Sequence, residues 1–401
     1  MKNFNTIIIW ISVAFLFFGS LLRVANLNIS FLQNITTSEN YPNISEIINN
    51  ISEHTNHNKE PQELYLIAWW DIMLSRNIWH LAKQEWYDRI FAQWNYNPII
   101  DFNKCIWENC ILFFNLESLF NEKDNDITRG WFDFRANSWN IKTLQQLKLN
   151  HIIALSLANN HTINTTYSWV VFTRNFLSEN NILYAWAGTT TWESREFIQI
   201  EKNGIKLCIW AYSYEWQFVK VWAGKMAWNS NNETEIKADL LKMNETGCDV
   251  KILSLHRWAE YRISPNTAQR DLAHSLVDAW ADLILWWHSH VPWEFEIYSG
   301  KYIFYSFGNF IFDQWWWRRT PWWNYDHIFD YELKKTTVPT YIWLLAWIQI
   351  KKDDNWVDII LDELKMNNVT NWLLQPLDSE TYSGILNRIN KTWLPVISNV
   401  F

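Results

Sequence analysis

Five apolar, strand-like runs each stop at a polar residue able to bind a metal or move a proton, and this pattern constrains the fold most. The runs are residues 64–70, 110–114, 152–158, 250–255 and 282–287. In open α/β sheets, ligands bind at the carboxyl ends of the strands. The five runs therefore predict an α/β domain with one shared crevice, lined by Asp71, Asn115, Glu117, Asn159, Asn160, His161, His256, His288 and His290.

His288 and His290 are one residue apart at the end of the last run. Side chains at positions i and i+2 of an extended backbone point to the same face, so both imidazoles could address one metal or two adjacent metals. By itself such a pair is more often two solvated turn histidines. The four companion runs are what favour a metal site.

Strand-like and helix-like segments alternate from residue 63 to about residue 313, which is the pattern of an α/β domain. Helical spacing predicts helices over 140–149, 167–179 and 269–279. Later segments predict antiparallel strands over 294–298, 302–307, 341–351 and 357–364. We assign residues 63–350 to this domain, and residues 351–401 to a C-terminal extension of strand and helical segments.

The N-terminal segment contains an uncharged run over residues 6–22, about as long as the shortest membrane-spanning helices. The small-residue pattern of a cleavage site is poor, because Arg23 lies two residues before Ala25. We therefore expect residues 1–23 to be an uncleaved anchor, with a cleaved signal as the alternative. Residues 24–62 are polar and predict a tether, so the domain is expected outside the cytoplasm on a single-pass membrane protein.

Tryptophan and glycine usage is unusual. The chain has 31 Trp and 9 Gly in 401 residues, whereas average usage of about 7% predicts roughly 28 glycines. Several Trp fall where the backbone favours glycine, as at Trp356 between two strand patterns and at Trp186 before Ala187. We infer a lineage that reads UGA as glycine. The alternative is a Trp-rich protein that stacks on sugars.

Charge and cysteine content narrow the range of possible partners and metal sites. A net charge of −8 argues against a nucleic-acid partner, which would require a basic face. Cys208 and Cys248 lie in or beside apolar runs and are most simply packed thiols, although an exported protein could bridge them. Cys105 and Cys110 are close enough for a local disulfide. No second cysteine pair stands at the spacing of a zinc finger.

The motifs at the run ends resemble those of the CapA-type family of bacterial poly-γ-glutamate capsule synthesis proteins, over roughly residues 64 to 350. The family pattern is Gly-Asp-x-Met-Leu, Asn-Leu-Glu, Ala-Asn-Asn-His, His-Trp-Gly-x-Glu-Tyr, Gly-x-His-Pro-His and Gly-Asn-Phe. Here these motifs stand, in order, at residues 70–74, 115–117, 158–161, 256–261, 286–290 and 308–310. Trp occupies the family's glycine positions 70, 258 and 286, while Arg257 replaces Trp and Ser289 replaces Pro.

The resemblance implies a metallophosphoesterase-like four-layer α/β sandwich with mixed sheets, here preceded by an N-terminal membrane helix. It also implies a divalent metal site with one or two ions of Mn, Fe or Zn, which suit carboxylate, amide and imidazole donors. His161 is the implied general acid. The implied ligands and their supporting residues are Asp71, Glu117, Asn160, His256, His288 and His290, with Asn115, Glu260 and Asn309 in support.

The implied function is capsule or envelope polymer synthesis by a membrane-anchored, metal-dependent hydrolase acting on a phosphoester or an anionic glutamyl polymer, with other capsule synthase subunits as candidate partners. Met73 departs from the pattern of the wider phosphoesterases, which carry a His ligand at this position. A methionine thioether offers only a soft donor. Met73 favours the alternative, a non-catalytic module that binds the polymer or assembles a synthase. Taken singly, Asp71 and Glu117 could be strand-end caps and Asn160 an Asx turn.

Overall fold

The computed structural model describes residues 62–75, 110–121, 134–148, 151–162, 167–185, 195–213, 233–257, 260, 264–312, 342–354, 356–370 and 373–376. These residues belong to one compact unit that begins at Gln62. The expected anchor and all of the tether except Gln62 lie outside the described residues. Among the helices that are described, none is long and apolar enough to cross a membrane.

The first sheet has eight strands in the order β16-β15-β14-β1-β2-β5-β6, with β13 also paired to β1. β1, β2, β5 and β6 run parallel, and β13 is parallel to β1. β14, β15 and β16 continue the sheet with antiparallel pairing. The strands are β1 Gln62–Ile72, β2 Cys110–Leu116, β5 Ile152–Ser156, β6 Leu183–Ala185, β13 Asn309–Ile311, β14 Ile342–Lys352, β15 Val357–Thr370 and β16 Leu373–Pro376.

The second sheet has six strands in the order β11-β12-β10-β9-β8-β7. β8, β9, β10 and β12 are parallel, while β7 and β11 lie antiparallel at the two edges. A separate parallel pair is formed by β3 and β4. These strands are β7 Ile198–Lys202, β8 Ile205–Ser213, β9 Val250–His256, β10 Leu283–Trp287, β11 Phe295–Tyr298, β12 Lys301–Phe304, β3 Leu119–Asn121 and β4 Arg135–Asn137.

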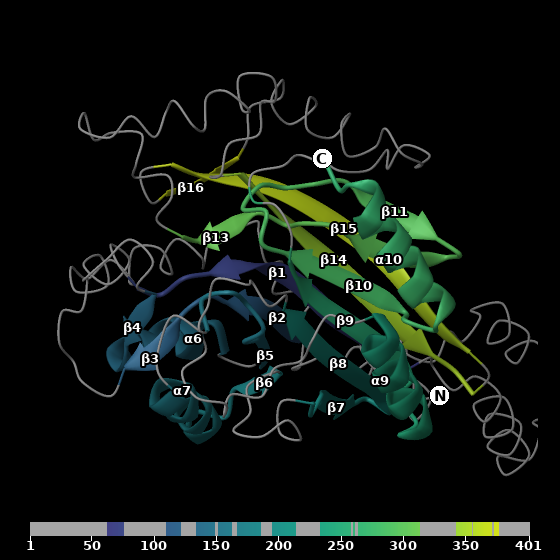
Figure 1. The fold of residues 1–401 in the computed structure, drawn as a ribbon, viewed down its shortest axis with the longest axis horizontal. Helices are drawn as coiled ribbons and strands as arrows, with labels where there is room; N and C mark the ends of the chain where they lie inside the picture. Colours follow the sequence, from purple (N-terminus) through teal and green to yellow (C-terminus); the bar gives the residue numbers. More distant parts are fainter. Residues whose placement is uncertain are drawn as a thin grey trace, which may run out of the picture. The chain divides into compact units, whose positions relative to one another are not determined.

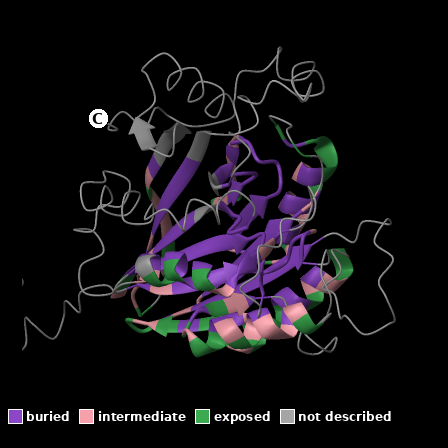
Figure 2. Cartoon of the chain, turned by 90° about the vertical axis from the view of Figure 1, so that its left-hand side faces the viewer, coloured by how far each residue is buried: buried purple, intermediate pink, exposed green. Residues whose placement is uncertain are grey.

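The two sheets pack against each other, and helices cover their outer sides (Figure 1). β1 contacts β8 and β10, and the ring of Phe113 lies 6.0 Å from that of Trp287 across the sheets. The inner strands are buried, whereas the helices expose one side (Figure 2). The α/β class with mixed sheets is thus confirmed. The helices are η3 Ser138–Asn140, α6 Ile141–Lys148 and α7 Tyr167–Glu179 on the first sheet, and α9 Glu233–Glu245 and α10 Thr267–Asp278 on the second.

The ends of α10 show how local sequence sets its bounds. Asn266 and Gln269 form a capping box, so the helix begins two residues before the expected position. At its end, Ala281 N–H donates to the Leu276 carbonyl at 3.0 Å and Trp280 N–H donates to the Val277 carbonyl at 2.9 Å. This is a Schellman arrangement, whose left-handed residue is usually glycine. Here that residue is Trp280, with φ of 77° and a side chain that is 58% exposed.

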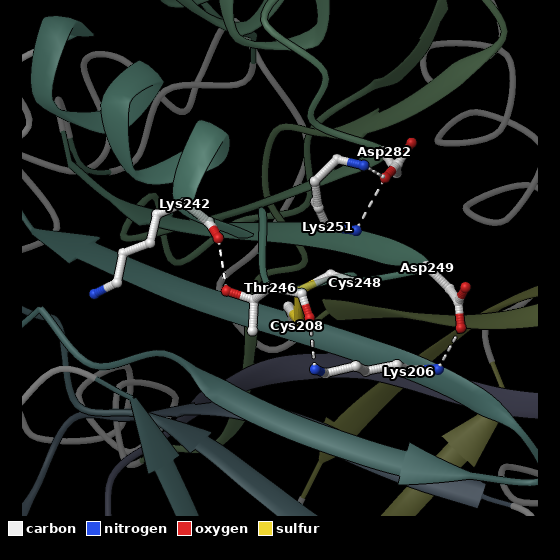
Figure 3. Close-up of a disulfide and its surroundings, with 8 residues drawn as sticks. All are labelled: Lys206, Cys208, Lys242, Thr246, Cys248, Asp249, Lys251 and Asp282. Atoms are coloured by element: carbon white, nitrogen blue, oxygen red, sulfur yellow. Dashed lines mark hydrogen bonds and ion pairs between the residues drawn. A yellow bond between two sulfur atoms is a disulfide. The ribbon is translucent and has the colours of Figure 1, made fainter. Parts of the chain in front are cut away.

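A disulfide joins Cys208 of β8 to Cys248, just before β9 (Figure 3). The expectation of two packed thiols is therefore wrong, and the bridged alternative holds. β8 and β9 are neighbours with Leu207 opposite Val250, which brings the two cysteines to a Cα separation of 5.8 Å. Cys110 is also disulfide-bonded; its expected partner, Cys105, lies outside the described residues.

Candidate metal centre

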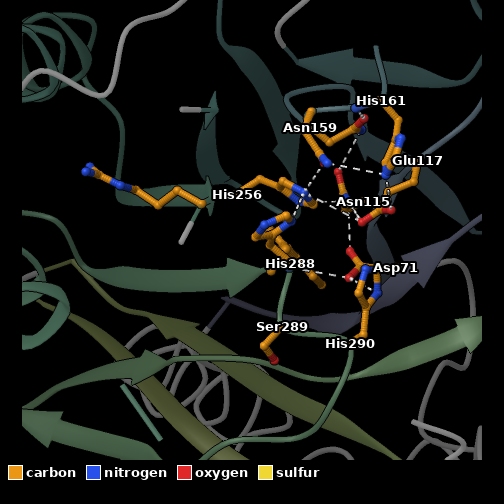
Figure 4. A network of polar contacts seen from close by, with 12 residues as sticks. Asp71, Asn115, Glu117, Asn159, His161, His256, His288, Ser289 and His290 are labelled. Atoms are coloured by element: carbon orange, nitrogen blue, oxygen red, sulfur yellow. Dashed lines mark hydrogen bonds and ion pairs between the residues drawn. The ribbon is translucent and has the colours of Figure 1, made fainter. Parts of the chain in front are cut away.

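The polar residues that end the five runs come together where the carboxyl ends of both sheets meet (Figure 4). β1, β2 and β5 bring their residues from the first sheet, and β9 and β10 bring the histidines from the second. The two sets touch, because the His288 N–H donates to Oδ2 of Asp71 at 3.4 Å. Asn160 is partly buried, and the other residues at the run ends are buried. The buried residues are Asp71, Asn115, Glu117, Asn159, His161, His256, His288 and His290.

His256 lies at the middle of one group of donor atoms. Its Nε2 is 3.0 Å from Oδ1 of Asn160 and 3.0 Å from Nδ1 of His288. The same Nε2 is 3.7 Å from Oε1 of Glu117. Donor atoms of Asp71, Glu117 and His256 lie within 4.8 Å of one another. The structure thus brings four predicted ligands together, because Glu117, Asn160 and His288 all lie close to Nε2 of His256.

Asp71 and His290 form a second group. Oδ2 of Asp71 lies 3.9 Å from Nδ1 of His290. That nitrogen is also 2.8 Å from Oδ1 of Asn309. The His290 ring packs against Phe312, with ring centroids 4.9 Å apart.

The two histidines of the His-x-His pair do not lie in extended backbone, so the geometric reason for expecting them on one face was wrong. β10 ends at Trp287, and His288 and His290 have φ of 89° and 60°. Positive φ is costly for residues other than glycine and collects at functional sites. As a result the two rings separate, with His288 facing His256 and His290 facing Asp71.

Two asparagines hold the acids and histidines in place. Nδ2 of Asn115 donates to Oδ1 of Asp71 at 2.7 Å and lies 3.3 Å from Oε1 of Glu117 and 3.1 Å from Nδ1 of His256. Nδ2 of Asn159 donates to Oδ1 of Asn115 at 3.2 Å. Asn115 therefore lies in contact with both acids and with His256, and its supporting role stays a prediction.

Asn159 also orders the segment that carries His161. Its Oδ1 accepts from the N–H groups of His161 and Thr162, each at 3.1 Å. Sequence reasoning placed Asn159 at a run end but gave it no role. The available signal was its position two residues before a candidate catalytic histidine, because asparagine oxygens often accept from the backbone two residues on.

The electrostatics of the centre follow from burial. Burial raises the pKa of Asp71 to about 7, against the lowering effect of the Asn115 hydrogen bond. Burial, with the nearby charges of His288 and His290, holds the pKa of His256 well below its ordinary value. His256 is therefore neutral near pH 7, the form in which imidazole binds a metal.

Comparison with known proteins identifies the family. The model of the family "Bacterial capsule synthesis protein PGA_cap" matches residues 66–314, which span all five run ends. The chain belongs to this family.

Two curated family relatives are similar over most of the chain. PGA biosynthesis protein CapA of Bacillus subtilis (strain 168) is 26% identical over 321 residues, covering 76% of this chain and 78% of that protein. Capsule biosynthesis protein CapA of Bacillus anthracis is 24% identical over 265 residues, covering 65% of this chain and 62% of that protein.

Likeness to solved structures is distant. The calcineurin-like phosphoesterase YfkN from Bacillus subtilis has a TM-score of 0.40 at 14% identity, covering 83% of this chain and 98% of that chain. A 5'-nucleotidase precursor from Thermus thermophilus has a TM-score of 0.39 at 11% identity, covering 82% of this chain and 58% of that chain.

The remaining predicted residues of this family member lie in different surroundings. Nε2 of His161 is 3.8 Å from Oε2 of Glu117, and its ring packs 3.7 Å from that of Phe134. Glu260 is exposed, and its charge contributes to raising the pKa of Asp71. The Met73 sulfur accepts from the Ser75 hydroxyl at 2.8 Å and from its N–H at 3.2 Å.

The donor set fits a divalent cation. It offers two buried carboxylates, an amide oxygen and buried imidazoles, which are the donor types of Mn, Fe and Zn sites. The buried carboxylates of Asp71 and Glu117 lie close to His256, whose imidazole is neutral near pH 7. A divalent cation would balance the negative charge of these carboxylates, and the assignment of these residues as its ligands is a prediction.

Proposed function

We propose that this capsule synthesis family member is a membrane-anchored, extracytoplasmic protein with a metal-dependent, hydrolase-type site. The observation that carries the proposal is the convergence on Nε2 of His256, with Asn160 and His288 each at 3.0 Å and Glu117 at 3.7 Å. Capping residues scattered over two sheets have no reason to converge in this way. A shared cation gives such a reason.

The residues that would hold one ion are Glu117, Asn160, His256 and His288, while Asp71 and His290 would face a second. When bound, divalent Mn, Fe or Zn supplies positive charge that polarises the bond under attack and lowers the pKa of water. The buried side chains around it exclude bulk water, which strengthens that effect. Asn115 keeps the carboxylate of Asp71 oriented through its 2.7 Å hydrogen bond.

His161 is the proposed general acid. Its position beside Glu117, at 3.8 Å, allows the carboxylate to stabilise a protonated ring. The ring is held by Phe134 on one side, and its backbone N–H is held by Asn159. From this position Nε2 would deliver a proton to the leaving group, a contribution typically of about 10²–10⁴ in rate.

The proposed substrate is a phosphoester or an anionic polymer such as poly-γ-glutamate. The name of the Bacillus subtilis relative, PGA biosynthesis protein, supports the polymer. The Cys208–Cys248 bridge supports an extracytoplasmic site of action, because disulfides persist in oxidising compartments. Residues 1–23 would provide the membrane anchor, other capsule synthase subunits are the proposed protein partners, and nucleic acid is not proposed as a partner.

The test compares the purified protein, loaded with Mn²⁺, with a His161→Ala variant and a His274→Ala control. His274 lies on α10 and contacts Glu296 rather than the centre. Substrates are bis(p-nitrophenyl) phosphate and poly-γ-glutamate. We expect His161→Ala to lower turnover by about 10²-fold or more and His274→Ala to leave it unchanged. Equal turnover in His161→Ala and the unaltered protein would remove the catalytic interpretation.

A second candidate function is a non-catalytic module that binds an envelope polymer or assembles a synthase at the same crevice. Met73 favours it, because its sulfur faces Ser75 where the wider phosphoesterases have a His ligand. This function predicts saturable binding of poly-γ-glutamate by the Mn²⁺-loaded protein, with no product from either substrate.

We also propose that Trp280 is glycine in the native protein, in a lineage that reads UGA as glycine. Its φ of 77° and its 58% exposure support this, since an exposed tryptophan gains no packing in return for a left-handed backbone. Trp286 stands at a family glycine position, but its side chain is fully buried and packs in the core. The exposed Trp280 is therefore the better support for reading UGA as glycine. TGA at codon 280 and a glycine mass in the native peptide are expected; TGG would overturn the proposal.

A further inference from the structure

The donors of the centre divide into two groups of unequal completeness. Glu117, Asn160 and His288 surround Nε2 of His256, so the first group has four predicted donors. In the second group, Oδ2 of Asp71 and Nδ1 of His290 face each other at 3.9 Å. A carboxylate oxygen of Glu117 lies within 4.8 Å of donor atoms of both Asp71 and His256, so this acid can be shared by the two groups. The second group then has three donors, the smallest number of side chains that protein sites for these metals usually supply.

Met73 does not complete the second group. Its sulfur accepts from both the hydroxyl and the N–H of Ser75, at 2.8 Å and 3.2 Å. Those contacts hold the thioether in a local turn after β1. A soft thioether is also a poor donor for a hard cation. A further donor for the second group would therefore come from another segment.

Asn309 is placed next to Asp71 by strand pairing. β13 runs parallel to β1 with Asn309 opposite Asp71, so the two side chains are neighbours on one face of the sheet. The Asp71 N–H donates to the Gly308 carbonyl at 3.5 Å. Gly308 has φ of 88°, a conformation glycine adopts without strain, and this turn leads the chain into β13 at Asn309.

The Asn309 carboxamide faces the second group. Its Oδ1 lies 2.8 Å from Nδ1 of His290, and the residue is 4% exposed. We propose that this oxygen is a further protein donor of a second cation position, beside Asp71, His290 and the shared Glu117, and fills the role that Met73 does not. The inference rests on the proposed function, since it requires that the centre binds a divalent cation.

The test is Mn²⁺ stoichiometry of the purified chain, by equilibrium dialysis with elemental analysis, together with electron paramagnetic resonance. The unaltered protein is expected to bind two Mn²⁺ with the spectrum of a spin-coupled pair. Asn309→Ala is expected to bind one Mn²⁺ with an uncoupled six-line spectrum. Asn309→Asp keeps an oxygen donor and is expected to bind two.

Met73 provides the matched control and a rescue. Met73→Leu is expected to leave both ions in place, because the sulfur is not a donor. The double variant Met73→His/Asn309→Ala is expected to regain the second ion. If Asn309 only orients His290, the double variant stays one ion short, and the inference fails.

The remaining outcomes separate this inference from the proposed function. Two coupled ions in Asn309→Ala overturn the inference and leave the proposed function standing. Binding of one ion by both the unaltered protein and Asn309→Ala would also overturn the inference and leave the proposed function standing. No ion in the unaltered protein overturns both. Circular dichroism checks that Asn309→Ala is folded, and if it is not, loss of the second ion in Asn309→Asp contradicts the inference by itself.

Discussion

Nε2 of His256 lies 3.0 Å from Nδ1 of His288, although His256 ends β9 and His288 follows β10 of the second sheet. Their rings are 4.7 Å apart at the centroids and tilted by 59°, so they do not stack. Two ring nitrogens at this distance either share a proton or share a cation. Asn160 and Glu117 approach the same nitrogen of His256, which favours the cation.

The first prediction concerns metal affinity. His256→Ala removes the donor at the middle of this group, and we expect Mn²⁺ affinity at that position to fall by more than about 100-fold, since loss of a ligand's hydrogen-bond partner alone costs about 10- to 100-fold. Isothermal titration calorimetry measures the change. His274→Ala, on α10, is the control and should bind as the unaltered protein does. Comparable affinity in both variants would contradict the assignment of His256.

The second prediction concerns the pH dependence of the metal-free protein. Burial raises the pKa of Asp71 from 3.8 to about 7, so between these values the folded state holds a proton that the unfolded state has released. The free energy of unfolding should therefore fall as pH rises through this range, by at most about 1.4 kcal/mol per pH unit from this group.

Urea titrations at pH 5, 6 and 7 measure this slope, and Asp71→Asn should make it less negative. The comparison is needed because His256 has the opposite effect: its lowered pKa means that the unfolded state binds more protons below pH 6.5. The same slope in Asp71→Asn as in the unaltered protein would show that Asp71 does not hold the proton.

The third prediction concerns the disulfide. Cys208 and Cys248 close a loop with a sequence separation of 40, and bridges of this kind stabilise proteins typically by about 2–4 kcal/mol. The double variant Cys208→Ser/Cys248→Ser should lose that amount in urea unfolding. A reducing agent should destabilise the unaltered protein more than the double variant. An unchanged free energy in the double variant would mean that the bridge does not form.

The fourth prediction concerns Trp280. Trp280→Gly should raise the free energy of unfolding by about 1 kcal/mol, because glycine adopts the left-handed backbone without the penalty of a side chain. Trp139→Gly is the control. Trp139 is also exposed, at 38%, but it lies in the helical turn η3, where glycine should destabilise. Stabilisation by both variants would point to a general effect of removing exposed tryptophan.

The meeting of Asp71 with the two later histidines could be predicted from the sequence. Each follows a continuous apolar run, such runs form strands buried on both faces, and ligands bind at the carboxyl ends of strands in open α/β sheets. The same logic placed Asn160 near His256. The helix at 167–179 was also predicted at its observed bounds, because helical spacing of apolar residues is clear there.

Other features depend on contacts that the sequence does not display. The positive φ of His288 and His290 arises after β10 ends, and no local residue type signals it. The pairing of Cys208 with Cys248 follows from the order of β8 and β9 in the sheet. The pairing of Asn309 with Asp71 requires β13 to return from the second sheet to the first, which no periodicity reveals.

The hydrogen bond from His288 to Asp71 spans 217 residues of sequence. A ribosome adds about 5–20 residues per second, so Asp71 leaves it on the order of 10 to 40 seconds before His288 does. Contacts of such high sequence separation form late in folding. The nascent chain thus has no complete set of donors for most of its synthesis, and the compartment in which the last strands join decides which cation is available for capture.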